Sequence, residues 1–571
     1  MRLSSEKAEQ IGTILSGGTT QEAVCQLLKS AEAGQITEGK LLLVETGNRK
    51  ILCRISQIIP YNDFYNIGDS WSEPRREGLQ IPEDVARRYE ICKLDLLIDI
   101  PQAEIKYPPR PGDKVIVLDP KKHEKEIFAV SQGAPKHIWY ASLSGYSGSS
   151  AAPVPLNMEN MPMHMAIFGV TGSGKSYSTG ALLEKLSAIP TPGGSKVSYP
   201  SIIIDAHGDY VDYVRFAEKN KLGEFGWVKR YVFPKAYLRT DMRVSRVTQA
   251  VGLNLDLLPA RELADIIILY LKGTTEGAEQ QIGFLDALFD FMRIEKGYST
   301  IHEAFLHHFG DFGDLVRELG EELQTAPATR SAVMRALNHF HEIETRYSLL
   351  STDSDLKLKT SVGGAESISF VEEITKQGGV AIFDFSADGA PGVDLSTKQL
   401  VMTYLATLLF IQFTSYKTRR DQNQGDRYLT FIIEEAQNFV PDRSFPVGSS
   451  LAHSKLSAIA TQGRKFGLGL CLISQRPSFV DRIVLSMCNS FMIHRISPDD
   501  VGFVKSVSGG LPSSLLPRLT TMNQGDMIIT GQLTTVPFPL VVHVPESDRK
   551  IKPTIGETNV VSNLAKLRGL S

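Results

Sequence analysis

The feature that most constrains the fold is a glycine-rich turn between a short apolar run and a helical segment. Residues 165–178 read MAIFGVTGSGKSYS, and Gly169 to Ser176 follow the spacing G-x-x-x-x-G-K-[ST]. Glycines at this spacing let backbone N–H groups curl around phosphate oxygens, and the following helix points its positive end at them. We therefore expect a strand ending near Phe168, a phosphate-binding loop and a helix starting near Lys175.

The alternative is an ordinary strand-to-helix turn in which Lys175 and Ser176 occur by chance. The flanking segments, AIF before the turn and SYSTGALLEKL after it, favour the phosphate loop because they supply its strand and its helix. Lys175 is expected to reach the β- and γ-phosphates of ATP, and the Ser176 hydroxyl to hold Mg²⁺. The residues expected to bind the nucleotide are Gly169, Thr171, Gly172, Ser173, Gly174, Lys175, Ser176, Tyr177 and Asp205.

A second signal is the stretch YLTFIIEEAQNFVP at 428–441, in which an apolar strand ends in two carboxylates. A phosphate-loop ATPase needs one acid directed toward Mg²⁺ and one base directed toward the attacking water. We assign Glu434 to the metal side and Glu435 to the water, both as catalytic residues. The alternative is an ordinary pair of acids at a solvated strand end.

Two further stretches carry candidate site residues. In GRKFGLGLCLISQRPS at 463–478, Gln475 follows a buried strand and could sense the γ-phosphate or simply end the strand. Arg464 could supply positive charge to a neighbouring subunit's transition state, or form a solvated salt bridge. In SIIIDAHGDY, Asp205, His207 and Asp209 suggest a metal site, but no further His/Asp cluster follows, and a turn capped by Asp205 is favoured.

Composition limits the class of protein. The chain has 571 residues, which predicts two or three domains, and its 61 basic and 64 acidic residues nearly cancel, so a DNA-binding surface must be local. The five cysteines form no CxxC pair, which fits a reducing cytoplasm. The N-terminal residues MRLSSEKAEQIG do not form a signal peptide, and the apolar run at 400–413 is too short to span a membrane, so it is expected to form a buried helix.

Changes in periodicity divide the chain. Short β-branched runs, among them AEQIGTILSG, PGDKVIVLD, KEIFAVSQG and a hairpin around TGNRK, predict a small barrel or sandwich. From about residue 160, apolar strands alternate with helices, which indicates an α/β fold with a mainly parallel sheet covered on both sides. The expected ranges are 1–150 for the barrel, 151–254 and 366–545 for the α/β core, 255–365 for a helical insertion and 546–571 for a C-terminal tail.

Taken together, the chain resembles the HerA-type ATPases of the HerA/FtsK group of DNA translocases. The resemblance is carried by GVTGSGKS, IIIDAHGDY, FIIEEAQNF, the stretch from GRKFG to MIHRIS, and GDMIITGQLTTVPFPLVVHVP. It implies a RecA-like P-loop core, an N-terminal HAS-type barrel and a hexameric ring that threads double-stranded DNA with ATP and Mg²⁺. It also implies an effector partner, such as a NurA-type nuclease in repair or a Sir2-type protein in antiviral defence.

Two positions depart from the family pattern. Glu434 stands where many phosphate-loop enzymes have Asp, and Thr461 stands where the family often has an arginine, which leaves Arg464 and Arg495 as candidates for the arginine acting in trans. Two other functions stay open: an ATP-gated scaffold that assembles and switches an effector, and a conjugation- or secretion-type pump, which would normally need a membrane anchor.

Overall fold

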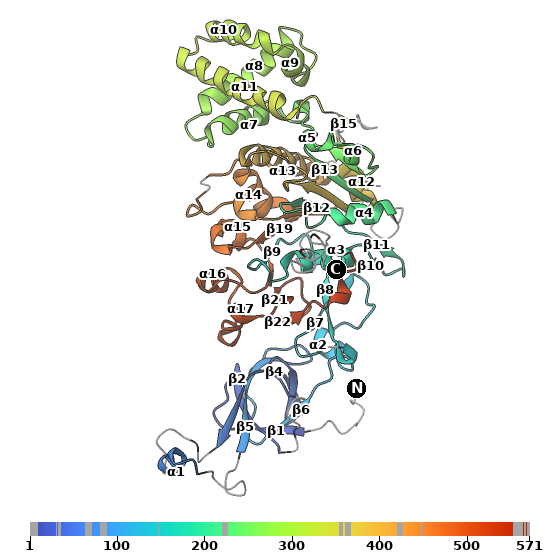
Figure 1. The fold of residues 1–571 in the computed structure, drawn as a ribbon, viewed down its shortest axis with the longest axis vertical. Helices are drawn as coiled ribbons and strands as arrows, with labels where there is room; N and C mark the ends of the chain where they lie inside the picture. Colours follow the sequence, from blue (N-terminus) through green and yellow to red (C-terminus); the bar gives the residue numbers. More distant parts are fainter. Residues whose placement is uncertain are drawn as a thin grey trace.

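The computed structural model describes residues 10–29, 31, 36–62, 65, 71–79, 88–146, 148–219, 227–352, 358–359, 367–418, 426–446, 449–551, 564 and 567. Figure 1 shows three parts stacked along the long axis: a barrel at one end, a large sheet with its helices in the middle, and a group of helices at the other end. The α/β fold with a mainly parallel sheet and an N-terminal barrel, as predicted, is confirmed.

The described N-terminal strands close into an antiparallel barrel in the order β1-β2-β5-β4-β3-β6. Alternate side chains, among them Val44, Ile51 and Leu94, fill its interior, and every second residue points outward, as the pleat requires. The barrel strands are β1 (Gln10–Ile14), β2 (Glu22–Leu27), β3 (Leu41–Thr46), β4 (Arg49–Asn62), β5 (Arg88–Ile100) and β6 (Lys114–Val117).

Residues 118–157 connect the barrel to the core. The segment KEIFAVSQG, predicted as a strand, instead contains the short helix α2 (Glu124–Phe128), which ends at Ala129 in the left-handed conformation. That prediction was wrong because Glu and Lys favour a helix, and the apolar run was too short to decide. β7 (His137–Leu143) and β8 (Pro153–Asn157) then pair with the large sheet through β22.

The large sheet has the strand order β14-β13-β17-β12-β18-β19-β9-β20-β21-β22-β7-β8 in the described residues, and it is parallel from β14 to β20. Its other strands are β9 (Met165–Phe168), β12 (Pro200–Asp205), β13 (Trp227–Val232), β14 (Thr248–Ala250), β17 (Gly379–Asp384), β18 (Leu429–Ile433), β19 (Leu468–Ser474), β20 (Ser490–Ile493), β21 (Asp526–Gly531) and β22 (Leu540–His543).

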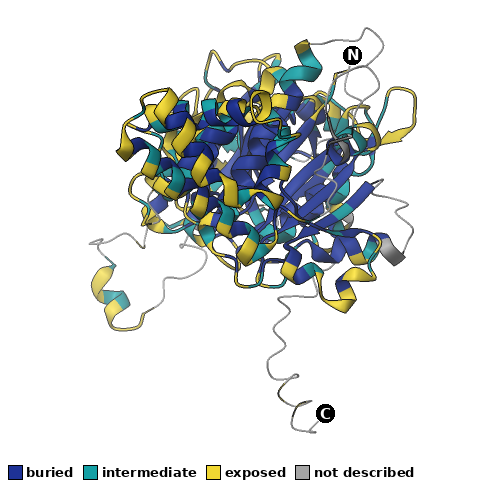
Figure 2. Ribbon diagram, turned by 90° about the horizontal axis from the view of Figure 1, so that it is seen from above, coloured by how far each residue is buried: buried dark blue, intermediate teal, exposed yellow. Residues whose placement is uncertain are grey.

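Both faces of this sheet are buried, so its strands are apolar almost throughout. Ala166 and Phe168 of β9 belong to one hydrophobic cluster, and Met165 and Ile167 belong to another. In Figure 2 the dark blue strands lie beneath helices whose outer surfaces are exposed. The covering helices are α3 (Lys175–Leu186), α4 (Val211–Lys219), α12 (Ser369–Gln377), α13 (Leu395–Thr418), α14 (His453–Gln462), α15 (Arg482–Ser486), α16 (Val501–Val507) and α17 (Arg518–Thr521).

Between β14 and β17 the chain forms the helical group at the end opposite the barrel. It comprises α7 (Ala260–Lys272), α8 (Glu279–Ile294), α9 (Ile301–His307), α10 (Phe312–Glu322) and α11 (Pro327–Tyr347). The predicted buried helix at 400–413 lies within α13. In the part of the chain that is described, no helix is both long and apolar enough to cross a bilayer.

Candidate nucleotide-binding and hydrolysis site

The phosphate loop connects β9 to α3, where the sequence predicted it. Gly172 and Gly174 have φ values of +74° and +101°, which side chains rarely adopt. A Cβ added to Gly169 would lie 2.5 Å from the Ser173 hydroxyl oxygen. The glycines are therefore needed for the backbone path, and the loop leads directly into the N-terminus of α3.

Two polar side chains of the loop are buried and short of partners. Lys175 is 9% exposed, and its Nζ lies 3.5 Å from the Val170 carbonyl oxygen. Burial lowers the pKa of Lys175, although nearby carboxylates, Glu435 first, oppose the shift. The Ser173 hydroxyl is buried without a hydrogen-bond partner in the described residues. Phosphate oxygens would satisfy both groups, so the loop fits a nucleotide.

Glu434 follows β18 and is buried, at 3% exposure. The Tyr210 hydroxyl donates to its Oε1 at 3.0 Å, and the backbone N–H of Ala206 donates to its Oε2 at 3.1 Å. Burial, with the neighbouring charges of Asp205 and Asp209, raises the pKa of Glu434 well above its ordinary value. The carboxylate thus lies in a place that favours an added positive charge.

Glu435 has the opposite environment. Its backbone is left-handed, at φ 48° and ψ 48°, a strained conformation that is frequent at functional sites. Burial raises the pKa of Glu435, but hydrogen bonds from His207, Gln437 and Gln475 outweigh it and hold the pKa below its ordinary value. The side chain is therefore an ionised acceptor at neutral pH, as a general base must be.

Gln475 joins the loop to this acid. It follows β19, which lies between β9 and β18. The Thr171 hydroxyl donates to its Oε1 at 2.5 Å, and its Nε2 donates to Glu435 Oε1 at 2.6 Å. A hydrogen-bonded chain thus runs from the phosphate loop to Glu435, and its groups can respond together to a ligand between them.

Asp205 caps the turn that follows β12, and this interpretation is confirmed. Its carboxylate accepts hydrogen bonds from four backbone N–H groups, those of His207, Gly208, Asp209 and Tyr210, at 2.7–3.2 Å. The metal alternative for this segment finds no support, because no group of three His, Cys, Asp or Glu within the described ranges could hold an ion. The capped turn instead positions the Tyr210 hydroxyl and the Ala206 N–H against Glu434.

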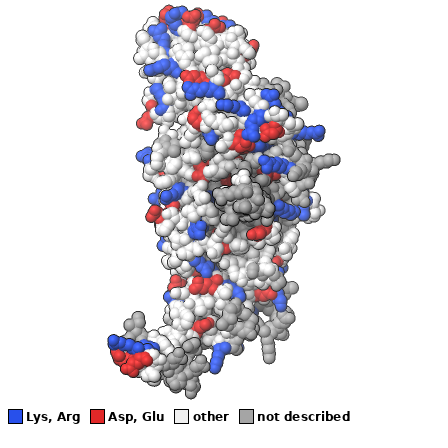
Figure 3. Space-filling model, viewed as in Figure 1, with Lys and Arg blue, Asp and Glu red and all other residues white. Residues whose placement is uncertain are grey.

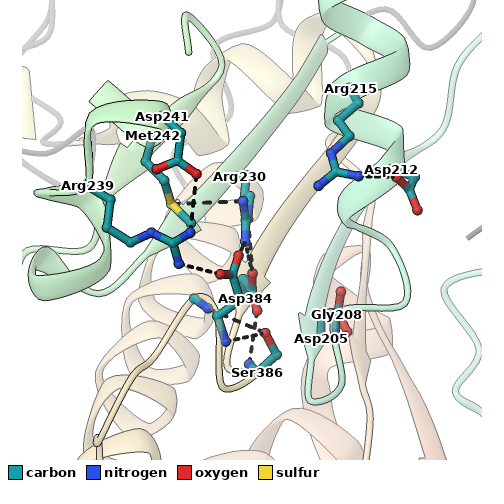
Figure 4. A network of polar contacts seen from close by, with 12 residues as sticks. Asp205, Gly208, Asp212, Arg215, Arg230, Arg239, Asp241, Met242, Asp384 and Ser386 are labelled. Atoms are coloured by element: carbon teal, nitrogen blue, oxygen red, sulfur yellow. Dashed lines mark hydrogen bonds and ion pairs between the residues drawn. The ribbon is translucent and has the colours of Figure 1, made fainter. Parts of the chain in front are cut away.

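Sequence reasoning missed an ion-pair network beside Asp205 (Figure 4). Asp384 ends β17 directly opposite Asp205 and is fully buried, and Arg230 of β13 donates to it through Nε at 3.0 Å. Arg230 also binds Asp388 at 2.9 Å, and Asp388 binds Arg239 at 2.6 Å. The network balances negative charge along the strand ends. The sequence did contain a signal, since the apolar strand in GGVAIFDFSADG ends at Asp384, just as the strand in SIIIDAHGDY ends at Asp205.

His494 is a second residue that the sequence did not single out. It follows β20 beneath the loop, with Nε2 2.8 Å from the Ser178 hydroxyl and Nδ1 3.1 Å from the Asp526 carbonyl oxygen. Burial lowers its pKa to about 3, so the ring stays neutral at physiological pH. It supports the loop and adds no positive charge next to Lys175.

The arginine candidates lie at different ends of the sheet. Arg464 is exposed and precedes β19, whereas Gln475 follows it, so Arg464 is about 20 Å, the length of a seven-residue strand, from its own chain's loop. Arg495 follows β20, and its carbonyl accepts from the Val170 N–H at 2.8 Å. Arg464 therefore does not act at its own chain's loop, and a role in a neighbouring subunit stays a prediction.

Ser176 and Tyr177 lie in the first turn of α3. The Ser176 carbonyl accepts a hydrogen bond from Arg549 at 3.1 Å, and the Tyr177 hydroxyl donates to the Glu546 carbonyl at 2.8 Å. A glycine-rich loop with a buried lysine, next to strand-end glutamates of which one is ionised, defines the nucleotide site of a P-loop nucleoside triphosphatase.

Comparison with known proteins narrows this class. The family described as the HerA helicase central domain matches residues 144–409. The DNA double-strand break repair helicase HerA of Saccharolobus solfataricus is 26% identical over 424 residues, 72% of this chain and 71% of that protein. The helicase of the same name from Sulfolobus acidocaldarius is 24% identical over 550 residues, 95% and 94% of the two chains. Over most of its length the chain is therefore similar to the HerA helicases, and its phosphate loop with the glutamate pair is that of an ATP hydrolase.

Among solved structures, VirB4 of Thermoanaerobacter pseudethanolicus is similar at a TM-score of 0.42 and 16% identity, covering 73% of this chain and 99% of that one. A similarity of this size carries no argument about function.

Proposed function

We propose that this chain is the subunit of an ATP-hydrolysing ring motor that translocates on or unwinds double-stranded DNA. The observation that carries the ATP-driven part is the hydrogen-bonded chain from Thr171 through Gln475 to Glu435. It joins the residues that contact the γ-phosphate to the acid that acts on water. Similarity to the HerA helicases supports the DNA-handling part.

In the proposed reaction, the loop N–H groups and Lys175 hold the β- and γ-phosphates. Glu435 accepts a proton from the attacking water, and Gln475 reports to Glu435 whether the γ-phosphate is present. Mg²⁺ neutralises charge on the phosphates when it is bound with the nucleotide. Mg²⁺ usually takes only one or two protein oxygens beside phosphates and waters, a number that the Ser176 hydroxyl and Glu434 supply.

We further propose a homo-hexamer with active sites between subunits. Support comes from Arg464, which is exposed at the end of the sheet opposite its own loop and so fits a role in a neighbour's site. The mixed charge on the face shown in Figure 3, where Lys and Arg alternate with Asp and Glu, fits DNA contacts confined to a pore.

The stretch after the glutamate pair, residues 441–457, is the proposed DNA contact. Residues 447 and 448 lie outside the described ranges, and the stretch expected to be a loop ends in the first turns of α14, which carry Lys455. Arg443 is exposed and lines a cavity of about 710 Å³ between this loop and the end of α7. Lys455, also proposed as a contact, is bonded to Glu262 of α7. We therefore assign the phosphate contact to Arg443 and treat Lys455 as a link to the helical insertion.

The partners and setting are also proposals. A NurA-type nuclease in DNA end processing, or a Sir2-type or nuclease effector in antiviral defence, would dock on the barrel. The five cysteines are all free and buried, which suits the reducing cytoplasm. The alternatives are an ATP-gated scaffold for an effector and a conjugation- or secretion-type pump.

ATP turnover in the presence of different activators separates these functions. The motor predicts that duplex DNA alone stimulates turnover, and that stimulation weakens steeply with salt because the contacts go to phosphates. Arg443→Ala should reduce the stimulation and spare basal turnover, with Lys455→Ala as the matched control that keeps most of it. Stimulation by an effector protein but not by DNA would replace the motor with the scaffold.

A further inference from the structure

The segment that follows β22, residues 545–551, lies along α3 and is called the strap here. Its Glu546 carbonyl accepts from the Tyr177 hydroxyl at 2.8 Å. Its far end is tied down by Glu184, which accepts from the backbone N–H groups of Lys550 and Ile551 at 2.8 Å and 3.0 Å. The strap therefore contacts the phosphate-loop helix from its first turn to its last.

Arg549 is the residue that the strap inserts into the core. It is 2% exposed, and its guanidinium lies over the rings of Tyr177 and Tyr213, 5.5 Å and 5.9 Å from their centroids. Three of its hydrogen bonds go to backbone carbonyls: Nη1 to Ser176 at 3.1 Å, Nη2 to Asp209 at 3.2 Å and Nε to Ile551 at 2.8 Å. A buried charge held mainly by carbonyls and ring faces is costly unless each contact is kept.

Helix α3 leaves space for the Arg549 guanidinium at Gly180. A Cβ added to Gly180 would lie 2.6 Å from Arg549 Cζ and 2.9 Å from the Tyr213 hydroxyl. Glycine inside a helix is destabilising, so α3 carries it where the guanidinium needs the space. Arg549 and Gly180 thus fit each other although they lie far apart in the sequence. The contact between Tyr177 and Glu546 joins the same two segments.

The two carbonyls that Arg549 joins belong to different parts of the ATP site. Ser176 carries the hydroxyl proposed for Mg²⁺ and follows Lys175. Asp209 precedes Tyr210, whose hydroxyl holds Glu434 at 3.0 Å. One guanidinium therefore spans the phosphate-loop helix and the turn that positions the strand-end acid.

We propose that Arg549 is a positioning residue for ATP binding and hydrolysis. It fixes the first turn of α3 relative to the capped turn after β12, so that Ser176 and Glu434 meet the same bound nucleotide. The inference rests on ATP hydrolysis at this site and does not depend on DNA. By reciprocity, ATP that binds more tightly when the strap is docked must also hold the strap more firmly.

The test compares two buried arginines in the full chain. Arg549→Gln should weaken binding of a fluorescent ATP analogue with Mg²⁺ about tenfold, because loss of a buried charged hydrogen-bond network is a large effect. Arg54, at 3% exposure, donates to Asp95 at 2.8 Å and to the Pro539 carbonyl at 2.9 Å, where the barrel meets the core. Arg54→Gln should lower the melting temperature comparably and leave nucleotide affinity within twofold.

Two further measurements separate positioning from plain stability. Arg549→Lys, which keeps the charge and some carbonyl contacts, should recover part of the lost affinity. Hydrogen exchange in residues 545–551 of the wild type should slow on addition of the analogue and Mg²⁺. Unchanged affinity in Arg549→Gln, with only a fall in melting temperature, would overturn the proposal.

If Arg549→Gln does not fold, Glu184→Ala decides the question, because it unties the far end of the strap without touching the nucleotide. Affinity at least threefold weaker supports the proposal, and unchanged affinity overturns it. Failure of the wild type itself to hydrolyse ATP would instead contradict the ATPase assignment, which makes the two failures distinguishable.

Discussion

The carboxyl edge of the large sheet and the wall of the N-terminal barrel are both built from buried strands, yet their ionisable groups behave differently. In the barrel, burial raises the pKa of Cys25 and of Cys92 to about 12. At the sheet edge, burial lowers the pKa of Lys175, and the charges of Glu435 and Glu434 oppose that shift. A shifted pKa therefore indicates function only where opposite charges converge on one space.

Among the described residues of the barrel, Arg54 and Asp95 form a buried ion pair far from the phosphate loop. Arg54 and Asp95 meet at 2.8 Å where the barrel contacts the core, and Ser514 donates to the same carboxylate at 2.8 Å. All these polar groups satisfy each other, whereas the Ser173 hydroxyl in the phosphate loop has no partner in the described residues. The barrel pair therefore joins two parts of the chain, whereas phosphate oxygens would satisfy the loop hydroxyl.

The largest expected effect is on Lys175. Replacing it with alanine removes the main counter-charge of the γ-phosphate, so ATP hydrolysis should fall by about a thousandfold or more. Steady-state phosphate release measures this. Near-normal turnover in Lys175→Ala would show that the sheet edge is not the catalytic site.

The next effect separates the two glutamates. Glu435→Gln should bind ATP normally and hydrolyse it about 10²–10³-fold more slowly, because an amide cannot accept the proton. Glu434→Gln should mainly weaken binding of ATP with Mg²⁺. Single-turnover rates and nucleotide affinity, measured for both variants, give the assignment, and the reverse pattern would exchange the two roles.

The barrel predicts a change of stability without a change of chemistry. Ile51 is fully buried in the barrel interior, so Ile51→Ala should lower the free energy of unfolding by about 2–5 kcal/mol. Turnover per folded subunit should stay within twofold of the wild type. A loss of turnover in protein that is still folded would show that the barrel is coupled to the ATP site, and it would contradict the difference between the two regions.

The smallest effect concerns His207, which lies 3.2 Å from Glu435. The hydrogen bond that His207 donates to this carboxylate raises the pKa of His207 above 6.5. The pair therefore stabilises the fold most between the pH at which Glu435 ionises and pH 6.5, and this stabilisation is lost as pH rises through the raised pKa of His207. Because His207 is half exposed, the contribution is about 0.5 kcal/mol.

Denaturant unfolding of wild type and His207→Gln across this range measures the difference. The difference should be largest in mildly acidic solution, where Glu435 is ionised and His207 is protonated, and should shrink toward zero in alkaline solution. A difference that grows with pH would mean that the pair is not ionic.

The sequence was most informative where function depends on close spacing. The phosphate loop, the capped turn and the glutamate pair each lie within a few residues and next to a strand, so their placement followed from local pattern. The contacts of Arg230 with Asp384, 154 residues apart, and of Arg549 with Asp209, 340 residues apart, depend on strand order and on the path of the strap. The periodicity of the sequence does not encode these long-range contacts. Helix α2, predicted as a strand, shows that a short apolar run does not decide even local structure.

The proposed motor requires that ATP hydrolysis at the sheet edge drives movement on duplex DNA. The most direct measurement is the rate of ATP hydrolysis by the purified full chain with and without blunt duplex DNA at low and high salt. We expect duplex DNA to stimulate ATP hydrolysis several-fold at low salt. The stimulation should disappear at high salt and should be absent in Glu435→Gln. Hydrolysis that is indifferent to duplex DNA at every salt concentration would contradict the proposed motor.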